Sequence, residues 1–135
     1  MTVRVGTLSL SNGEVGVITG LQTSGEVWLS DRISLNSGAS YLMTGGTIHY
    51  GVSGLIADNG SFVQEGGDLT VLDTGLFADE FGDFQVRGGG TYTISGGSHA
   101  SKDISVYDGG RFQIVGDDAT ISSFFVSTFD GNAYG

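Results

Sequence analysis

Apolar and polar residues alternate along most of this chain in short runs that glycines interrupt. The stretch from Gly60 to Gly82, G-S-F-V-Q-E-G-G-D-L-T-V-L-D-T-G-L-F-A-D-E-F-G, contains three such runs separated by corner-forming residues. Alternation with a period of two is typical of β-strands that bury one face. Because no segment has the i, i+3, i+4, i+7 apolar spacing of an amphipathic helix, the pattern predicts an all-β chain of short strands.

Copies of this stretch recur on both sides of it, with turn glycines at intervals close to 22 residues. One interval is 28 residues, which predicts an inserted surface loop at residues 95–103. An aromatic column and an aliphatic column recur with the same intervals and form the predicted core stack: Tyr41, Phe62, Phe84 and Phe112, with Ile33, Leu55, Leu76, Ile104 and Val126.

These repeats predict a single-stranded parallel β-helix of about six coils, each of ~22 residues and three short strands, forming one domain over residues 1–135. A single unit cannot bury its own apolar face, so like residues of neighbouring coils must stack. Outward positions such as Gln64, Thr70 and Gln85 are expected to form polar ladders. An antiparallel sandwich or barrel is the alternative. The constant phase of the glycine pairs favours the β-solenoid.

Two segments carry a resemblance to a known group of proteins. Residues 60–71, G-S-F-V-Q-E-G-G-D-L-T-V, and residues 82–94, G-D-F-Q-V-R-G-G-G-T-Y-T-I, resemble the repeats of bacterial surface β-helix proteins. These include autotransporter passenger regions and, more distantly, pectate-lyase-like solenoids. The resemblance covers residues 38–131 and implies extracellular display, adhesion or scaffold duty. Whether these residues are an excerpt of a longer chain stays open.

The composition limits the kinds of partner that the protein can bind and the cellular location that we expect for it. Fifteen acidic residues against five basic ones give a net charge of −10, which repels nucleic acid and anionic lipid. The apolar runs are short, so we expect no membrane insertion. With no cysteine, disulfides and thiolate metal sites are excluded. We expect an extracellular or cell-surface location, although the start of the chain shows no signal-peptide pattern. A virion structural protein is the alternative.

Acidic residues gather at one predicted corner of the repeat. Stacking would place them in a ladder of like charges, which a calcium ion bound by several oxygen atoms could relieve. The alternative is that they are solvated turn residues, since Asp and Asn tolerate left-handed backbone geometry. The calcium hypothesis rests on Asp58, Asp79, Glu80 and Asp108.

The two histidines do not form a recognisable site. His49 falls on the outward side of a predicted strand, and His99 falls in the predicted inserted loop together with Lys102. We expect both histidines to be exposed to solvent, and the loop to be the most individual feature of the surface. No metal-binding histidine spacing and no G-x-S-x-G motif occur.

An enzymatic reading has few candidate residues. Lys102 is the only candidate base for a polysaccharide lyase, and a glycosidase would need two facing carboxylates. Asp79 with Asp83, or Asp117 with Asp118, are the candidate pairs. We therefore expect a protein without catalytic activity and without a required cofactor.

The end of the chain is apolar, which bears on association. A β-solenoid must cover its open terminal coils, and no amphipathic capping helix is evident in the sequence. The predicted function is a non-catalytic structural or adhesive surface module that self-associates as a trimer or an end-to-end fibre. The alternative is a β-helix that binds or degrades polysaccharide; a host-surface ligand also fits an adhesive module. The predicted interface residues are Phe124, Phe125, Phe129 and Tyr134.

Overall fold

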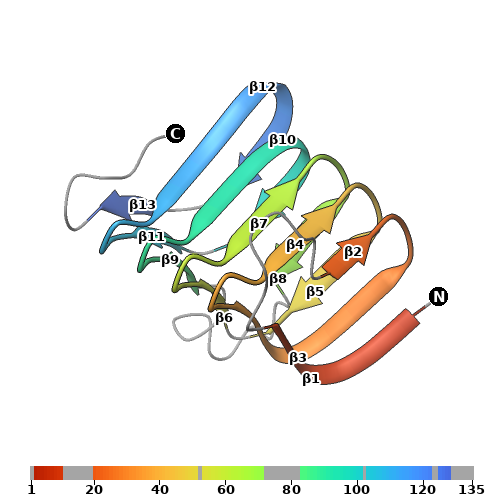
Figure 1. Ribbon diagram of the computed structural model, residues 1–135. Helices are drawn as coiled ribbons and strands as arrows, with labels where there is room; N and C mark the ends of the chain where they lie inside the picture. The colour runs from red at the N-terminus through yellow and green to blue at the C-terminus, as the bar shows by residue number, and fades with distance from the viewer. Residues whose placement is uncertain are drawn as a thin grey trace.

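The computed structural model of the chain describes residues 2–10, 20–51, 53–71, 83–101, 103–122 and 125–128. These residues form thirteen β-strands and no helix, and every strand pairing among them is parallel. Figure 1 shows the strands wound into a stack of coils, with β1 at one end and β13 near the other. The predicted parallel β-helix is confirmed.

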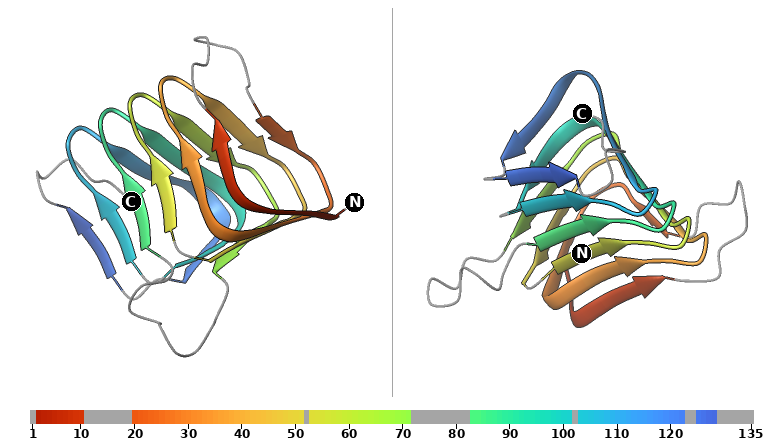
Figure 2. Two further views of the ribbon diagram at one scale, coloured as in Figure 1. Left: turned by 90° about the horizontal axis from the view of Figure 1, so that it is seen from below. Right: turned by 90° about the vertical axis from the view of Figure 1, so that its left-hand side faces the viewer.

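Each coil has three faces, and Figure 2 shows their rungs lying side by side along the stack. Face 1 is formed by β2 (Gly20–Gln22), β4 (Ser40–Met43), β7 (Ser61–Gln64) and the first parts of β10 (Thr91–Ala100) and β12 (Arg111–Ser122). Face 2 is formed by the first parts of β1 (Thr2–Leu10) and β3 (Glu26–Leu35), by β5 (Thr47–Tyr50) and β8 (Asp68–Val71), and by the second parts of β10 and β12. Face 3 is formed by the second parts of β1 and β3, and by β6 (Ser53–Ile56), β9 (Asp83–Val86), β11 (Asp103–Val106) and β13 (Phe125–Thr128).

The lengths of the turns correct two details of the prediction. Successive register partners on face 1 are separated by 21, 21, 30 and 20 residues, at Gly20, Tyr41, Phe62, Tyr92 and Phe112. From β2 to β12 the chain therefore completes about four turns, fewer than the six expected. The long turn contains residues 72–82, which lie outside the described residues. The loop predicted at residues 95–103 is wrong, because residues 95–100 belong to β10 and Asp103 begins β11.

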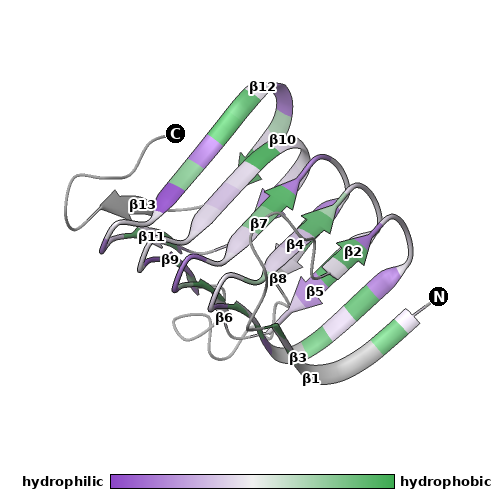
Figure 3. Ribbon diagram, in the orientation of Figure 1, coloured by the Kyte–Doolittle hydropathy of each residue, from purple (hydrophilic) through white to green (hydrophobic). Residues whose placement is uncertain are grey.

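Side chains alternate between the inside of the coil and its outer surface. In the four-residue strands β4, β6, β7, β9 and β11, half-buried residues alternate with buried ones. Figure 3 shows apolar and polar residues alternating along the strands. The inward side chains form one apolar core, as a half-buried parallel sheet requires. Six predicted members of the core stack are buried, namely Tyr41, Phe62, Phe84, Phe112, Ile33 and Ile104.

Two members of the predicted stack occupy other positions. Phe84 lies on face 3, where its partners are Gly54 and Ile104; the aromatic next to Phe62 on face 1 is Tyr92. Leu55 is half-buried and points outward, since the inward residue at that point is Gly54. Val126 continues the Ile104 column in register, and Leu76 lies outside the described residues.

The absence of an inward side chain at Gly54 is explained by the packing of Phe84. The Phe84 ring occupies the space that a side chain at position 54 would fill, because an added Cβ atom would overlap the ring. The Tyr50 and Phe84 ring centroids lie 6.1 Å apart in an edge-to-face arrangement. A large residue is therefore accommodated by a small one on the preceding rung, which keeps the core dense without steric strain.

The corner between faces 1 and 2 requires glycine because successive coils approach each other closely there. A Cβ atom on Gly45 would lie 2.5 Å from the Thr23 carbonyl oxygen, and one on Gly66 would lie 2.5 Å from that of Thr44. No side chain fits at such distances without moving one coil away from the next. The recurring glycine pair thus sets the spacing of the coils.

Candidate functional surfaces and a buried polar network

The predicted calcium corner lies between faces 3 and 1, and the structure describes two of its four residues. Asp58 and Asp108 have positive φ angles of 50° and 55°, as the turn-residue alternative requires. The rung between them has Gly88 at this position, so the two carboxylates stand about 10 Å apart at two strand spacings. The described residues contain no group of three potential metal ligands. Asp79 and Glu80 lie outside the described residues, and calcium binding stays a prediction.

The prediction for His99 is wrong. Its side chain is 1% exposed and lies on β10 inside the coil, instead of in a solvated loop. The ring is edge-to-face with Phe84, with centroids 5.0 Å apart. His49 lies on the outer surface of face 2 beside Thr70, as expected, and is mostly covered, with its side chain 18% exposed. Lys102 lies outside the described residues.

A chain of buried hydrogen bonds connects His99 to the preceding coil. Gln64 donates both amide hydrogens, to the carbonyl oxygens of Gly67 at 3.0 Å and Ser98 at 2.7 Å. The Tyr92 hydroxyl donates to Gln64 Oε1 at 2.6 Å, so it accepts from His99 Nδ1 at 2.9 Å. His99 Nε2 therefore accepts from the hydroxyl of Ser101, at 2.8 Å.

This network assigns a neutral tautomer to His99, protonated at Nδ1. Although a serine beside a histidine is a familiar catalytic pair, Ser101 is 6% exposed and His99 is 1% exposed. Both side chains are largely excluded from solvent. The hydrogen bonds from Gln64 through Tyr92 and His99 to Ser101 give each of these buried side chains a partner and hold two coils in register.

The acid stability of the protein is expected to depend on His99. Burial lowers the pKa of His99 from the usual 6.5 to about 3. Between these two values the folded state binds fewer protons than the unfolded state, so stability is lost as the pH falls, by about 1.4 kcal/mol per pH unit. Urea unfolding at pH 6.5, 5.5 and 5.0 measures this slope. The variant His99→Gln is expected to have a shallower slope than the parent, whereas His49→Gln keeps the His99 contribution. Equal slopes for the parent and His99→Gln would refute the assignment.

The contact between Gln64 and Tyr92 recurs two coils away, although Gln64 had been expected to point outward. Tyr41 donates to Gln22 Oε1 at 2.9 Å, and the Gln22 amide reaches the Gly25 and Thr47 carbonyl oxygens at 3.4 and 3.2 Å. Where the glutamine position holds an apolar residue, the next rung has a phenylalanine in place of tyrosine. The four successive couples on face 1 are Gln22 with Tyr41, Met43 with Phe62, Gln64 with Tyr92, and Ile94 with Phe112.

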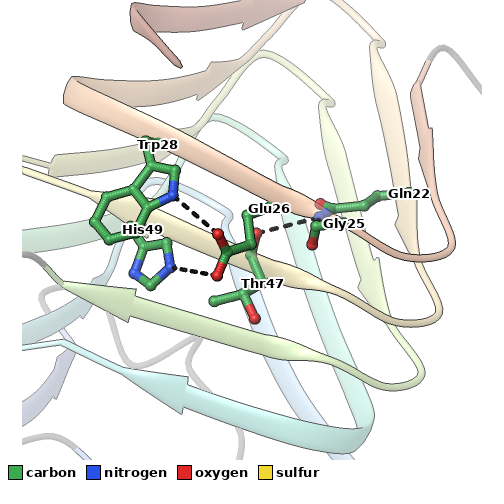
Figure 4. A network of polar contacts seen from close by, with 6 residues as sticks. All are labelled: Gln22, Gly25, Glu26, Trp28, Thr47 and His49. Atoms are coloured by element: carbon green, nitrogen blue, oxygen red, sulfur yellow. Dashed lines mark hydrogen bonds and ion pairs between the residues drawn. The ribbon is translucent and has the colours of Figure 1, made fainter. Parts of the chain in front are cut away.

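The outer surface of face 2 carries a second network, which Figure 4 shows from close by. Trp28 and His49 stack with their ring centroids 3.6 Å apart and their planes 14° from parallel. Trp28 Nε1 donates to Glu26 Oε2 at 3.3 Å, and His49 Nε2 lies 3.9 Å from Glu26 Oε1. The stack joins β3 to β5 on the outside of the coil. Sequence reasoning gave no role to Trp28, the single tryptophan of the chain.

The outer surface of face 3 places two carboxylates side by side. Asp83 and Asp103 are direct register partners on β9 and β11, and both belong to the outward set. Asp103 Oδ1 is buried and has no hydrogen-bond partner among the described residues. Next to them, Tyr107 donates to Gln85 Oε1 at 2.9 Å, and Arg87 donates to the Tyr107 hydroxyl at 3.4 Å. Sequence reasoning had paired Asp83 with Asp79 instead, which lies outside the described residues.

At both ends of the stack, the outermost strands have one edge without a pairing partner among the residues that the structure describes. Among the described strands, β1 pairs only with β3 and β2 only with β4; at the other end β12 pairs only with β10 and β13 only with β11. One predicted interface residue, Phe125, is the first residue of β13, which is the outermost described strand of face 3 at the C-terminal end of the stack. Phe124, Phe129 and Tyr134 lie outside the described residues.

The comparisons with known proteins give no relative for this chain. No family, no curated protein and no solved structure matches it. The described residues also contain no helix long and apolar enough to cross a membrane. The class of protein that the structure defines is thus the parallel β-solenoid. The more specific likeness to bacterial surface proteins rests on the sequence repeats alone.

Proposed function

We propose that this chain is a non-catalytic structural or adhesive module that associates with further copies of itself end to end, outside the cell or at its surface. The observation that carries the proposal is the open rung at each end, where one backbone edge has no partner among the described strands. An exposed parallel edge is a template for pairing with another chain. The proposal is therefore supported by the edges that have no partner among the described strands at the two ends of the solenoid.

The terminal rungs also expose side chains that belong to the core. Val3 is 40% exposed at one end and Ile114 is 39% exposed at the other, although Ile48 in the first of these columns and Ile94 in the second are fully buried. Covering them would remove apolar surface from water, which favours association. The two ends differ in sequence, so a contact between unlike ends repeats and generates a fibre.

Self-association is tested by light scattering after size-exclusion chromatography, over a range of protein concentrations and at low and high salt. We expect the mass to rise with concentration. The rise is expected to be larger at high salt, because a net charge of −10 on each copy opposes assembly until ions screen it. A single monomeric mass at every concentration and salt would contradict the proposal.

One observation favours the polysaccharide alternative. Asp83 and Asp103 are outward register partners on adjacent rungs, and a retaining glycosidase uses two neighbouring carboxyls that are ~5–5.5 Å apart. The parent, Asp83→Asn and Asp103→Asn would be compared on a panel of polysaccharides, with release of reducing ends and retention on immobilised glycan as readouts. Loss of either readout in both variants would favour this function, and blank readouts for the parent would exclude it.

A further inference from the structure

We infer that copies meet through β1 of one copy and the outermost strands of faces 2 and 3 on another, with Thr2 beside Thr120 and Leu8 beside Val126. The inference rests on the proposed self-association and adds the strands, the register and the polarity of the contact. Faces 2 and 3 both begin with β1, and both end with a strand that has one edge without a partner among the described strands. A second copy can therefore extend these two faces by one rung.

The length of the corner between faces 2 and 3 supports this pairing. In β1, Thr7 at the start of face 3 comes four positions after Val3, an inward residue of face 2. The same interval is four positions in the last two coils, but five in the two coils that follow β1. The equivalent residues are His99 with Asp103 and Ile121 with Phe125 in the last coils, and Val27 with Arg32 and Ile48 with Ser53 in the coils after β1. Pairing with β3 therefore needs a register shift inside β1, whereas pairing with residues 120–128 needs none.

The inward columns of both faces continue across this junction with aliphatic residues. On face 2, the column ends at Ile121, which packs partly buried against the core, and the next copy adds Val3, which is 40% exposed. On face 3, the column of Ile104 reaches Val126 in register, and the next copy adds Leu8, which is partly buried. The junction therefore repeats the coil-to-coil packing of the solenoid and removes apolar surface from water.

The contact joins unlike ends, because every described strand pairing of the chain is parallel. Two like ends related by a two-fold axis would meet with their strands antiparallel. Unlike ends keep the pairing parallel, and they leave a second β1 edge and a second C-terminal edge for further copies. The same contact can then repeat along a fibre.

Face 1 has one described rung fewer than faces 2 and 3, because it begins with β2. In the inferred junction, β2 of one copy and the first part of β12 of the other are two strand spacings apart, about 10 Å. The sequence after β13 has the pattern of one more rung: F-D-G-N-A-Y-G at residues 129–135 is similar to Y-D-G-G-R-F-Q at residues 107–113, which lead from face 3 to face 1. Residues 129–135 lie outside the described residues, so faces 2 and 3 provide the test of the register.

Cysteine pairing tests the register, because the native chain has no cysteine. Thr2 and Thr120 are exposed residues of one outward column, and in the inferred junction they become neighbours on adjacent rungs. Strands in a sheet lie about 4.8 Å apart, within the Cα separation that a disulfide bridges. Thr2→Cys and Thr120→Cys are prepared as separate proteins, each retaining its β-sheet circular dichroism, and are mixed under mild oxidation. We expect a disulfide-linked dimer in the mixture and little in either protein alone.

Two further mixtures are matched controls. Thr2→Cys with Ser98→Cys tests the same column one rung further inside the stack, and Leu21→Cys with Gln113→Cys tests the wider spacing on face 1. Both are expected to link little, because their Cα atoms would be about 10 Å apart, beyond the reach of a disulfide. Equal linkage in either control, or homodimers of Thr120→Cys alone, would overturn the inferred register.

A second pair of variants tests the contact without cysteine, with light scattering over a range of concentrations as the readout. Val3→Glu places a charge in the inward column and is expected to weaken association by roughly tenfold or more, because the junction would bury that charge without a partner. Thr2→Glu adds the same charge at the neighbouring outward residue and is expected to weaken association far less. Equal effects would overturn the pairing. A parent that stays monomeric removes the proposed function itself, whereas a parent that associates without linkage between positions 2 and 120 removes only this register.

Discussion

Replacing Gln64 by methionine is expected to lower the free energy of unfolding by about 2–4 kcal/mol, although methionine fills a similar volume. The side chain is fully buried, and its amide is a donor to the carbonyl oxygens of Gly67 and Ser98. Methionine supplies no donor, so buried acceptors lose a partner and the Tyr92 hydroxyl loses the Gln64 acceptor. Chemical denaturation followed by circular dichroism measures the change.

Gln113→Met is the matched control for this loss. Gln113 is half-buried on the outward side of β12, so the same substitution there is expected to change stability by less than about 0.5 kcal/mol. A similar cost at both positions would show that the buried hydrogen bonds of Gln64 do not account for its effect. The comparison thus separates an inward glutamine from an outward one in the same type of coil.

The sequence was sufficient for the fold class because the physics of a β-solenoid is local and repeated. Each coil needs short alternating strands for its core and small residues where coils approach, and the pairs Gly45-Gly46, Gly66-Gly67 and Gly96-Gly97 mark that corner in three successive coils. These patterns can be recognised in the sequence without knowledge of long-range contacts. The fold class was therefore predictable, while the register between distant coils was harder to fix.

The register was misassigned because strands of different faces look alike. Phe62 in S-F-V-Q and Phe84 in D-F-Q-V are 22 residues apart, close to the period, yet they lie on faces 1 and 3. Because the sequence alignment treated Phe62 and Phe84 as equivalent, the insertion was predicted at residues 95–103 instead of at residues 72–82. Only the pairing of the strands distinguishes the two faces, since both have the same alternation of polarity.

The position of His99 had a signal that was overlooked. Counting two residues past the glycine pair gives Ile48 in G-G-T-I, Leu69 in G-G-D-L and His99 in G-G-S-H, and these three residues are register partners in one inward column. Aligning the glycine pairs would have placed this histidine in the core. Its partners Tyr92 and Ser101 could not be predicted in the same way, because the contacts depend on side-chain geometry across coils.

Substituting alanine for Gly97 is expected to lower the free energy of unfolding by about 3–5 kcal/mol, combining an unfavourable backbone conformation with a steric clash. Gly97 has a φ angle of 78°, which a residue with a Cβ atom rarely adopts. The added Cβ would overlap the Gly67 carbonyl oxygen and lie 2.8 Å from the Gly66 carbonyl carbon. Backbone atoms cannot rotate away, so the coil formed by β10 must separate from the one before it. Urea denaturation of the parent and the variant measures the loss.

Gly116→Ala isolates the steric part of this cost. Gly116 has nearly the same φ angle, 80°, but an added Cβ there would meet nothing within 4 Å. Its substitution therefore carries only the conformational penalty, about 1 kcal/mol. The difference between the two variants measures how strongly stacked coils exclude any side chain at this corner. If both alanine variants lose the same free energy of unfolding, the close approach of the coils does not contribute to the loss at position 97. The left-handed backbone geometry alone would then explain the glycine there.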